Sequence, residues 1–319
     1  MSDELVVEDL WVRYGSTAAV RGVSLRAAPG RTLALVGESG CGKSSLALAL
    51  ARLLPAGAQT AGTVRVGQLE LSAASGRALR EARGRVVAYM PQDAMAALNP
   101  VHPGGRQIAE VLRLRSGLDR AASQIAAIRL LGAVGISEPA AAARRYPHEL
   151  SGGMRQRVML AIALAGKPRV LIADEPTTAL DVTVQAGILA QVRRLVVSEA
   201  MTLIWITHDI GVVAELADDV AVMYGGKIVE RGVVHDIFER PAHPYTRALV
   251  GSARDSRLAA PKSRFDAIPG APPVGAFPPG CPFHPRCAHA MPICLTSEPA
   301  PRPVSDGHAC ACHLVERAA

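Results

Sequence analysis

Short runs of apolar, often β-branched residues recur along the first three quarters of the chain and predict strands. Four of them cover residues 32–36, 86–89, 170–173 and 203–206. Runs of this length without polar alternation are typical of strands that are buried on both faces, as in parallel sheets. Longer helical patterns rich in Ala, Leu and Arg separate them, most clearly over residues 94–165. The alternation predicts an α/β fold with a mostly parallel sheet.

The pattern changes near residue 245. Residues 261–303 are crowded with proline, which excludes a regular helix or a central strand there. We therefore expect a domain over residues 1–245, with a helical part at about 94–165, and an irregular extension rich in Cys and Pro over residues 246–319.

Charge and hydropathy narrow the classes of partner. The net charge is +7, but the basic residues are scattered and aromatic residues make up only 3% of the chain. Stacking platforms for nucleic acid are therefore not expected. The first ten residues lack the apolar run of a secretory signal, and no stretch reaches the roughly 18 apolar residues of a membrane-spanning helix. A role at a membrane would need the helices of other subunits.

Residues 37–44 read Gly-Glu-Ser-Gly-Cys-Gly-Lys-Ser and match the pattern of a phosphate-binding loop. A predicted strand precedes them and a helical pattern follows, which argues against a chance match. Glycines let backbone N–H groups turn toward phosphates at the start of a helix. Lys43 would reach the β- and γ-phosphates, and the Ser44 hydroxyl would bind Mg²⁺. The sequence therefore predicts a Mg-ATP site.

The apolar run at 170–173 ends in two carboxylates, Asp174 and Glu175. The end of a buried strand exposes such residues at the edge of the sheet, where Asp174 can hold Mg²⁺ and Glu175 can act as general base toward water. Acidic pairs after apolar runs are common, and it is the upstream loop that makes this pair significant.

A second turn, Leu-Ser-Gly-Gly-Met-Arg-Gln-Arg at residues 150–157, precedes another helical pattern. Ser151 could be an ordinary N-cap. Alternatively, its hydroxyl and the helix-start amides form a second phosphate site. Because one nucleotide does not need two such sites, we expect this one to face the nucleotide of a partner subunit.

With these motifs in this order, the chain resembles the nucleotide-binding subunits of ATP-binding-cassette (ABC) transporters. The resemblance implies a P-loop NTPase fold whose RecA-like core carries antiparallel β and helical subdomains. It also implies further roles: Tyr14 stacks on adenine, Gln92 senses Mg²⁺ and the transmembrane partner, Asp181 lies in the D-loop at 179–181, and His208 contacts the γ-phosphate. The complete predicted ATP and Mg²⁺ set is Tyr14, Gly37, Ser39, Gly40, Gly42, Lys43, Ser44, Ser45, Gln92, Ser151, Gly153, Gln156, Asp174 and Asp181, with Glu175 and His208 as the catalytic residues.

Segments at 92–100, 146–149 and 243–246, together with the cysteine-containing tail, resemble the oligopeptide/dipeptide/nickel importer subfamily. Residues 154–157 and 179–185 resemble its "D"-type ATPase. The resemblance implies a heterodimer with an "F"-type ATPase, two permease subunits, an extracytoplasmic solute-binding protein, and a peripheral location on the cytoplasmic face of the cell membrane. We expect an ATPase that powers uptake of dipeptides or oligopeptides. Nickel chelates, glutathione-like cargo and a soluble, non-transport ABC ATPase are the alternatives.

Five of the six cysteines lie between residues 281 and 312. The spacing of Cys281, Cys287, Cys294 and Cys312 fits zinc poorly, because zinc sites usually have closer pairs. A [4Fe–4S] cluster, which needs four thiolates without a fixed spacing, is the favoured interpretation, and some relatives with this tail carry one. Zinc and metal-free thiols remain alternatives, and Cys310 could replace Cys312. His284, His308 and His313 are alternative ligands.

The sixth cysteine, Cys41, lies inside the predicted phosphate loop. A thiol at a helix N-terminus tends to have a lowered pKa. We therefore expect alkylation of Cys41 to inhibit ATP hydrolysis and ATP to protect against it.

Overall fold

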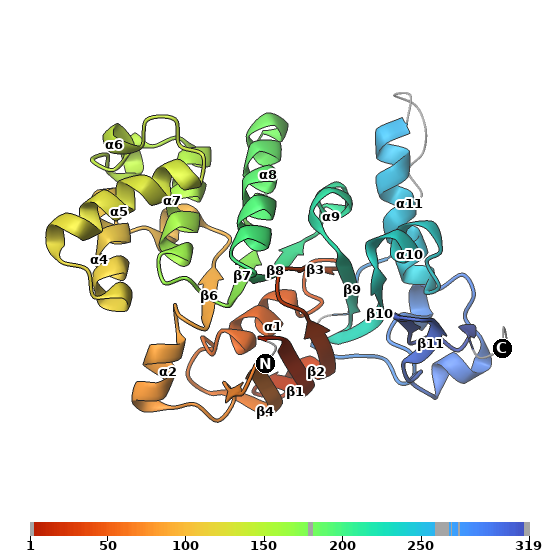
Figure 1. The fold of residues 1–319 in the computed structure, drawn as a ribbon. Coiled ribbons are helices and arrows are strands. Elements are labelled where there is room, and N and C mark those ends of the chain that lie inside the picture. Colours follow the sequence, from red (N-terminus) through yellow and green to blue (C-terminus); the bar gives the residue numbers. More distant parts are fainter. Residues whose placement is uncertain (1–2, 178–180, 259–267, 269, 274, 316–319) are drawn as a thin grey trace. The chain divides into compact units, whose positions relative to one another are not determined.

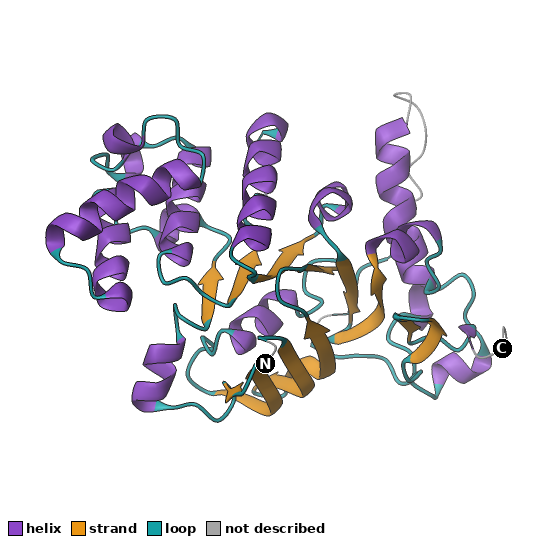
Figure 2. Ribbon diagram, viewed as in Figure 1, coloured by secondary structure: helices purple, strands orange, loops and turns teal. Residues whose placement is uncertain are grey.

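The computed structural model describes residues 3–177, 181–258, 268, 270–273 and 275–315. The chain forms two compact units. One comprises Met1–Leu5, Ala27–Thr32 and Arg65–Trp205, and the other comprises Val6–Arg26, Leu33–Val64 and Ile206–Ala319. Figure 1 labels their elements, and Figure 2 colours them by type. Among the described residues no helix is both long enough and apolar enough to cross a membrane.

The first unit joins a parallel strand group to a helical part. Strands β6 and β7 pair in parallel, with Val87 opposite Val170, and β7 lies between β6 and β8. Every residue of β7 and β8 is buried, as expected for strands covered on both faces. The elements are β5 (Leu69–Glu70), α2 (Gly76–Ala82), β6 (Val87–Met90), α3 (Ala94–Ala97), α4 (Gly104–Ser116), α5 (Arg120–Ala133), α6 (Pro139–Ala142), the 3₁₀ turn η1 (Pro147–Glu149), α7 (Gly152–Leu164), β7 (Val170–Asp174), α8 (Val182–Ser198) and most of β8 (Thr202–Thr207).

Helices α4, α5, α6 and α7 lie together in Figure 1 and bury their apolar faces against one another. Ile108 of α4 and Leu131 of α5 are fully buried. Gly105 lets α4 approach the chain after α6, because a Cβ there would lie 2.7 Å from the carbonyl oxygen of Ala143. Helices α5 and α7 begin at side-chain N-caps: Asp119 accepts a hydrogen bond from the Ala122 amide, and Ser151 accepts one from the Met154 amide.

The second unit contains the antiparallel β subdomain, with strand order β2-β1-β4, and a second strand group ordered β11-β12-β10-β9-β3. Strand β3 pairs in parallel with β9, and β10 runs antiparallel to β9 and to β12. The elements are β1 (Leu5–Tyr14), β2 (Thr17–Ala27), β3 (Thr32–Val36), α1 (Lys43–Leu50), β4 (Ala58–Val66), α9 (Ile210–Leu216), β9 (Asp219–Tyr224), β10 (Lys227–Val233), α10 (Val234–Glu239), α11 (Pro244–Leu258), the 3₁₀ turns η2 (His284–Arg286) and η3 (Pro292–Leu295), β11 (Arg302–Ser305) and β12 (His308–Cys310).

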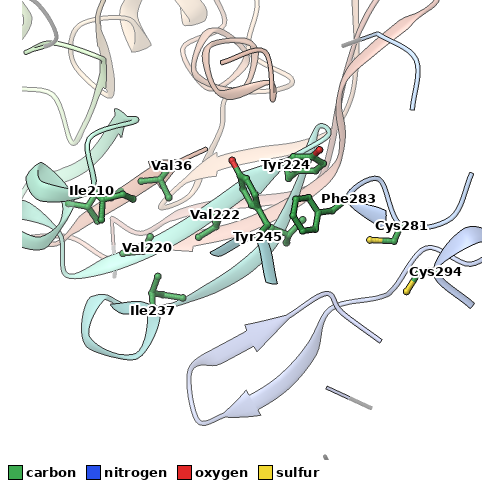
Figure 3. Packing of buried hydrophobic residues seen from close by; sticks show 13 residues of the cluster. Val36, Ile210, Val220, Val222, Tyr224, Ile237, Tyr245, Cys281, Phe283 and Cys294 are labelled. Carbon is green, nitrogen blue, oxygen red and sulfur yellow. The ribbon is translucent and has the colours of Figure 1, made fainter. Parts of the chain in front are cut away.

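The C-terminal tail packs into the same hydrophobic cluster as the strands of this unit (Figure 3). Val36 of β3 and Val222 of β9 share this cluster with Phe283 and Cys294 of the tail. The ring centroids of Tyr224 and Phe283 are 5.2 Å apart in an edge-to-face arrangement, which is a favourable aromatic geometry. The tail is therefore irregular in its backbone but well packed in its side chains.

Candidate nucleotide-binding site

The loop at residues 37–44 joins β3 to α1, as the sequence predicts. Gly37, Gly40 and Gly42 have positive φ angles of 153°, 82° and 105°. A Cβ on Gly37 would lie 2.2 Å from the Met223 carbonyl oxygen, and one on Gly42 would lie 2.3 Å from the Ala19 carbonyl oxygen. Glycine is therefore required at both positions, by conformation and by space.

Lys43 begins α1 and turns its side chain back over the loop. Its Nζ donates to the carbonyl oxygens of Gly37 at 2.7 Å and Glu38 at 3.0 Å, and the residue is only 5% exposed. Ser39, Gly40 and Ser44 are exposed, and Ser45 is half-buried. A glycine cradle with an ordered cation beside it fits a polyphosphate, and the exposed Ser44 hydroxyl fits a Mg²⁺ ligand.

The expectation of a lowered pKa at Cys41 is wrong. The side chain is 2% exposed and faces Gly37, and burial raises the pKa of its thiol even though the Lys43 ammonium opposes this. The thiol points into the protein, where the cost of desolvating a thiolate outweighs the nearby positive charge. Alkylation of native Cys41 is therefore not expected to be easy.

Asp174 and Glu175 stand at the carboxyl end of β7. Asp174 is 4% exposed, and its Oδ2 accepts a hydrogen bond of 3.1 Å from the Tyr89 hydroxyl. Glu175 is half-buried, and its Oε2 accepts a 3.2 Å hydrogen bond from Gln92 Nε2. The structure therefore brings together three of the predicted residues in the first unit.

The backbone of Glu175 has a φ of 46°, in the left-handed region that non-glycine residues rarely adopt. Strain of this kind costs about 1–3 kcal/mol and is concentrated at functional sites. Burial raises the pKa of Tyr89, with the Asp174 charge adding to the shift, so its hydroxyl remains a neutral donor to the carboxylate. Neither the positive φ of Glu175 nor the role of Tyr89 was identified from the sequence. The only signal for Tyr89 was its place at the end of a predicted strand.

The turn at Ser151 forms the N-terminus of α7. The Ser151 hydroxyl caps the helix at 3.3 Å from the Met154 amide and remains exposed. A Cβ on Gly153 would lie 2.6 Å from Cγ1 of Val184, and Gln156 is buried one turn into the helix. A hollow of about 320 Å³ beside this turn is lined by both Ser151 and Gly153. Both readings of Ser151 are therefore compatible: it is an N-cap, and its helix start is open to a ligand.

The remaining predicted residues lie at the ends of elements. Asp181 is the N-cap of α8 and accepts a 2.9 Å hydrogen bond from the Val184 amide, whereas residues 179 and 180 of the predicted D-loop lie outside the described residues. His208 follows β8 and is exposed, and Tyr14 ends β1 half-buried. The loop at 37–44, Ser45, Tyr14 and His208 belong to the second unit, and the other predicted nucleotide and catalytic residues belong to the first.

The four cysteines proposed as cluster ligands lie in one region of the tail. Cys281 and Cys294 are buried, and Cys287 and Cys312 are half-buried. Burial, followed by the charges of the other three thiols, raises the pKa of Cys281 to about 11. In the part of the chain that the structure describes, no group of three or more His, Cys, Asp or Glu is placed to hold a metal ion. As they stand, these thiols do not form a ready-made metal site.

The alternative tail ligands have structural partners. Cys310 is fully buried in β12 opposite Glu230 of β10. The ring nitrogens of the three candidate histidines lie within hydrogen-bond distance of other groups. The partners are the Cys281 carbonyl for His284, the Glu230 carboxylate for His308 and the Ser297 carbonyl for His313.

Two family models match the chain. The model described as "ABC transporter" matches residues 20–178, and the model described as "Oligopeptide/dipeptide transporter, C-terminal region" matches residues 229–294. The loop at 37–44 and the carboxylates after β7 lie inside the first match. Much of the cysteine-containing tail lies inside the second.

Curated relatives align along almost the whole chain. The oligopeptide transport ATP-binding protein OppD of Mycobacterium tuberculosis is 46% identical over 99% of this chain, although the chain spans only 52% of that relative. The dipeptide transport ATP-binding protein DppD of Bacillus subtilis is 42% identical over 100% of this chain and 97% of its own length. OppD of Salmonella typhimurium is 43% identical over 92% of this chain and 89% of its own length.

A solved structure supports the fold independently. The dimeric ATP-binding cassette MJ0796, in a post-hydrolysis state with ADP and Pi, superposes with a TM-score of 0.65 at 23% identity, covering 72% of this chain and 98% of the cassette. At that identity the likeness concerns the fold alone, and it agrees with the predicted P-loop α/β architecture. The chain therefore belongs to the ABC transporter family, and within it to the ATP-binding proteins of the oligopeptide and dipeptide transporters.

Proposed function

We propose that this chain is the ATP-hydrolysing subunit of an importer for oligopeptides or dipeptides. The observation that carries the proposal is the loop at 37–44, where two sterically obligatory glycines frame the buried amine of Lys43. The transport of peptides is inferred from relatives such as the Bacillus subtilis dipeptide transport protein, which the chain matches from end to end. Nickel chelates and glutathione-like solutes remain alternative cargo.

Phosphate binding is assigned to the loop at 37–44. Lys43 exchanges its hydrogen bonds to the loop carbonyls for bonds to the β- and γ-phosphates, and the backbone amides of Ser39, Gly40 and Ser45 add neutral donors. Tyr14 stacks on the adenine ring. As the family resemblance implies, Ser44, Gln92 and Asp174 would supply oxygen ligands for Mg²⁺, which would neutralise charge on the phosphates.

Hydrolysis is assigned to Glu175. Its carboxylate takes a proton from the attacking water, and the 3.2 Å hydrogen bond from Gln92 orients it. The water oxygen bonds to the γ-phosphorus, the bond from that phosphorus to the β–γ bridging oxygen breaks, and ADP leaves, while His208 holds the γ-phosphate. The Tyr89 hydroxyl holds the neighbouring Asp174 carboxylate in place.

The Ser151 turn is assigned to the nucleotide of a second subunit. Ser151, Gly153 and Gln156 present a helix start to that nucleotide, and Asp181 contributes at the shared interface. The partner is an "F"-type ATPase, and the segment after Gln92 transmits closure to two permease subunits in the cell membrane. An extracytoplasmic binding protein delivers the solute. A soluble, non-transport ABC ATPase is the less favoured alternative.

The test is Glu175→Gln. We expect the variant to retain ATP affinity and to lose about 10²–10⁴-fold in turnover, the range that a general base contributes. Phosphate release and binding of a fluorescent ATP analogue measure the two quantities separately. The control is Glu199→Gln, because Glu199 is an exposed carboxylate at the end of α8 in the same unit. Hydrolysis at the parent rate would assign the base to another residue.

A [4Fe–4S] cluster on Cys281, Cys287, Cys294 and Cys312 is kept as a separate proposal about the tail. It rests on the number and spacing of these cysteines and on the family resemblance of the tail. Iron, acid-labile sulfide and visible absorbance of anaerobically prepared protein test it. Zinc at one atom per chain, or no metal, would contradict it, and neither result affects the assignment of ATP hydrolysis.

A further inference from the structure

Arg286 is a buried cation in the C-terminal tail. It ends the short turn η2, next to Cys287, and its side chain is 6% exposed. Burying a guanidinium is costly unless strong partners compensate its charge. The identity of those partners therefore indicates what the residue does.

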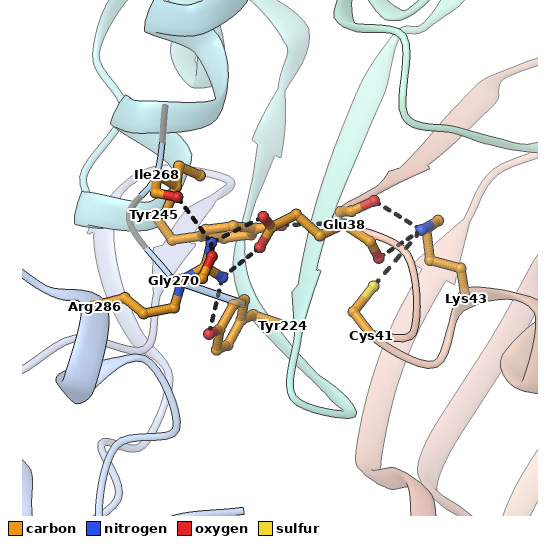
Figure 4. A network of polar contacts seen from close by, with 9 residues as sticks. Glu38, Cys41, Lys43, Tyr224, Tyr245, Ile268, Gly270 and Arg286 are labelled. Carbon is orange, nitrogen blue, oxygen red and sulfur yellow. Dashed lines mark hydrogen bonds and ion pairs between the residues drawn. The ribbon is translucent and has the colours of Figure 1, made fainter. Parts of the chain in front are cut away.

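The principal partner is Glu38, inside the phosphate-binding loop (Figure 4). Nη1 of Arg286 donates to Oε2 of Glu38 at 2.6 Å, and Nη2 donates to Oε1 at 2.9 Å. The pair is bidentate, which fixes orientation as well as distance. It joins residues that are 248 positions apart in the sequence.

The guanidinium also donates hydrogen bonds to groups other than Glu38. Nη1 donates to the Tyr224 hydroxyl at 3.2 Å, and Nη2 donates to the carbonyl oxygens of Ile268 and Gly270, each at 3.3 Å. The pKa of Arg286 is raised, first by its hydrogen bonds to Glu38, so its charge is permanent at any working pH. Arg286 is therefore a fixed anchor, and the loop is what it holds.

Glu38 links this anchor to the phosphate-binding lysine. Its carbonyl oxygen accepts from Lys43 Nζ at 3.0 Å and its backbone N–H donates to the Tyr245 hydroxyl at 2.8 Å. Tyr245 belongs to α11, and its ring packs 5.4 Å from that of Phe283 in the tail. The tail therefore holds the side chain of Glu38 through Arg286, and Phe283 of the tail packs against Tyr245, which holds the backbone of Glu38.

We propose that Arg286 is a positioning residue for ATP binding, and that the C-terminal extension holds the phosphate loop in its binding geometry through the Arg286–Glu38 pair. The proposal rests on the proposed function. Two effects contribute. A loop held in place does not have to be ordered when ATP binds. In addition, Arg286 neutralises a carboxylate that would otherwise repel the phosphates.

The test uses the full chain and measures the Kd of a fluorescent ATP analogue and the KM and kcat of ATP hydrolysis. We expect Arg286→Met to raise Kd and KM about tenfold, the loss typical of a charge-assisted hydrogen bond, with kcat nearly unchanged. Arg286→Lys keeps the charge without the bidentate geometry. We expect its Kd and KM to lie between those of the parent and those of Arg286→Met. If Arg286→Met fails to fold, Arg286→Lys carries the same comparison.

A double variant separates the positioning of the loop from the repulsion of the phosphates. Glu38→Gln combined with Arg286→Met removes the uncompensated carboxylate. We therefore expect the double variant to bind ATP better than Arg286→Met and less tightly than the parent. The matched control is Lys227→Met. Lys227 forms an ion pair of 2.7 Å with Glu298 of the tail and does not belong to the hydrogen bonds around Glu38.

Parent-like Kd and KM in both Arg286 variants would overturn the proposal. Equal weakening by Lys227→Met would also overturn it, because any tail contact would then have the same effect. A parent chain that does not bind the ATP analogue would instead contradict the proposed function.

Discussion

His243 is buried among aromatic rings at the beginning of α11, and burial keeps its imidazole neutral. The residue is 1% exposed, and its ring lies 5.7 Å from that of Phe283. Its Nδ1 accepts a 3.0 Å hydrogen bond from the Tyr245 amide, so this nitrogen carries no proton. Desolvation lowers the pKa of His243 from 6.5 to about 3. The residue therefore supports the position of Tyr245 only in its uncharged form.

Because the folded-state pKa lies below the unfolded value, the unfolded chain binds one more proton between pH 3 and pH 6.5. The free energy of unfolding should therefore fall as pH decreases through this window, by up to about 1.4 kcal/mol per pH unit from this residue. Urea unfolding at several pH values measures the slope. His243→Gln should flatten it, and His235→Gln should not, because the His235 side chain is 74% exposed. An unchanged slope in His243→Gln would place the acid sensitivity elsewhere.

Among the elements, the central strands were the most predictable from sequence. The run at 32–36 coincides with β3, and the runs at 86–89, 170–173 and 203–206 fall within one residue of β6, β7 and β8 at each end. Their uniform burial is the reason, since a strand covered on both faces has an unbroken apolar pattern. The same pattern placed the loop at 37–44 and the carboxylates after β7.

The environment of the loop was much less predictable. Glu38 occupies a position of the motif that any residue can fill, and its partner Arg286 is distant in sequence. The environment of Cys41 was not predictable either. Its position at a helix start predicted a reactive thiol, but the side chain points inward and the thiol is buried. Side-chain direction within a loop depends on tertiary packing, which local sequence does not encode.

Substitution of Gly42 tests the geometry of the loop at 37–44 directly. Gly42→Ala should destabilise the second unit by more than about 4 kcal/mol and abolish ATP binding, because the new Cβ would meet the Ala19 carbonyl oxygen at 2.3 Å. Gly57→Ala is the control: Gly57 also has a positive φ, of 90°, but its Cβ would meet nothing within 4 Å. It should cost about 1–3 kcal/mol of backbone strain and leave ATP affinity intact. Equal effects of the two substitutions would mean that conformation alone, without close packing, makes Gly42 necessary.

At the scale of the whole molecule, the sequence predicts that an ATP site is shared between two subunits. The basis is chemical: one chain carries two helix starts suited to phosphate, at Lys43 and at Ser151. The domain boundary near residue 245 stays a prediction. The tail beyond it nevertheless shares a hydrophobic cluster with β3 and β9, which a composition change could not reveal.

Sharing of the site leads to a prediction about Ser151→Arg in the purified transporter. The arginine should block the helix start that faces the partner's nucleotide, lowering hydrolysis roughly tenfold or more. It should leave this chain's own ATP affinity within about twofold, because the loop at Lys43 is untouched. Photolabelling of this chain by azido-ATP measures its affinity, and phosphate release measures turnover. Ser198→Arg, at an exposed position at the end of α8, is the control and should change neither quantity. Loss of labelling in Ser151→Arg would place Ser151 in this chain's own site, and the two helix starts would then serve one nucleotide.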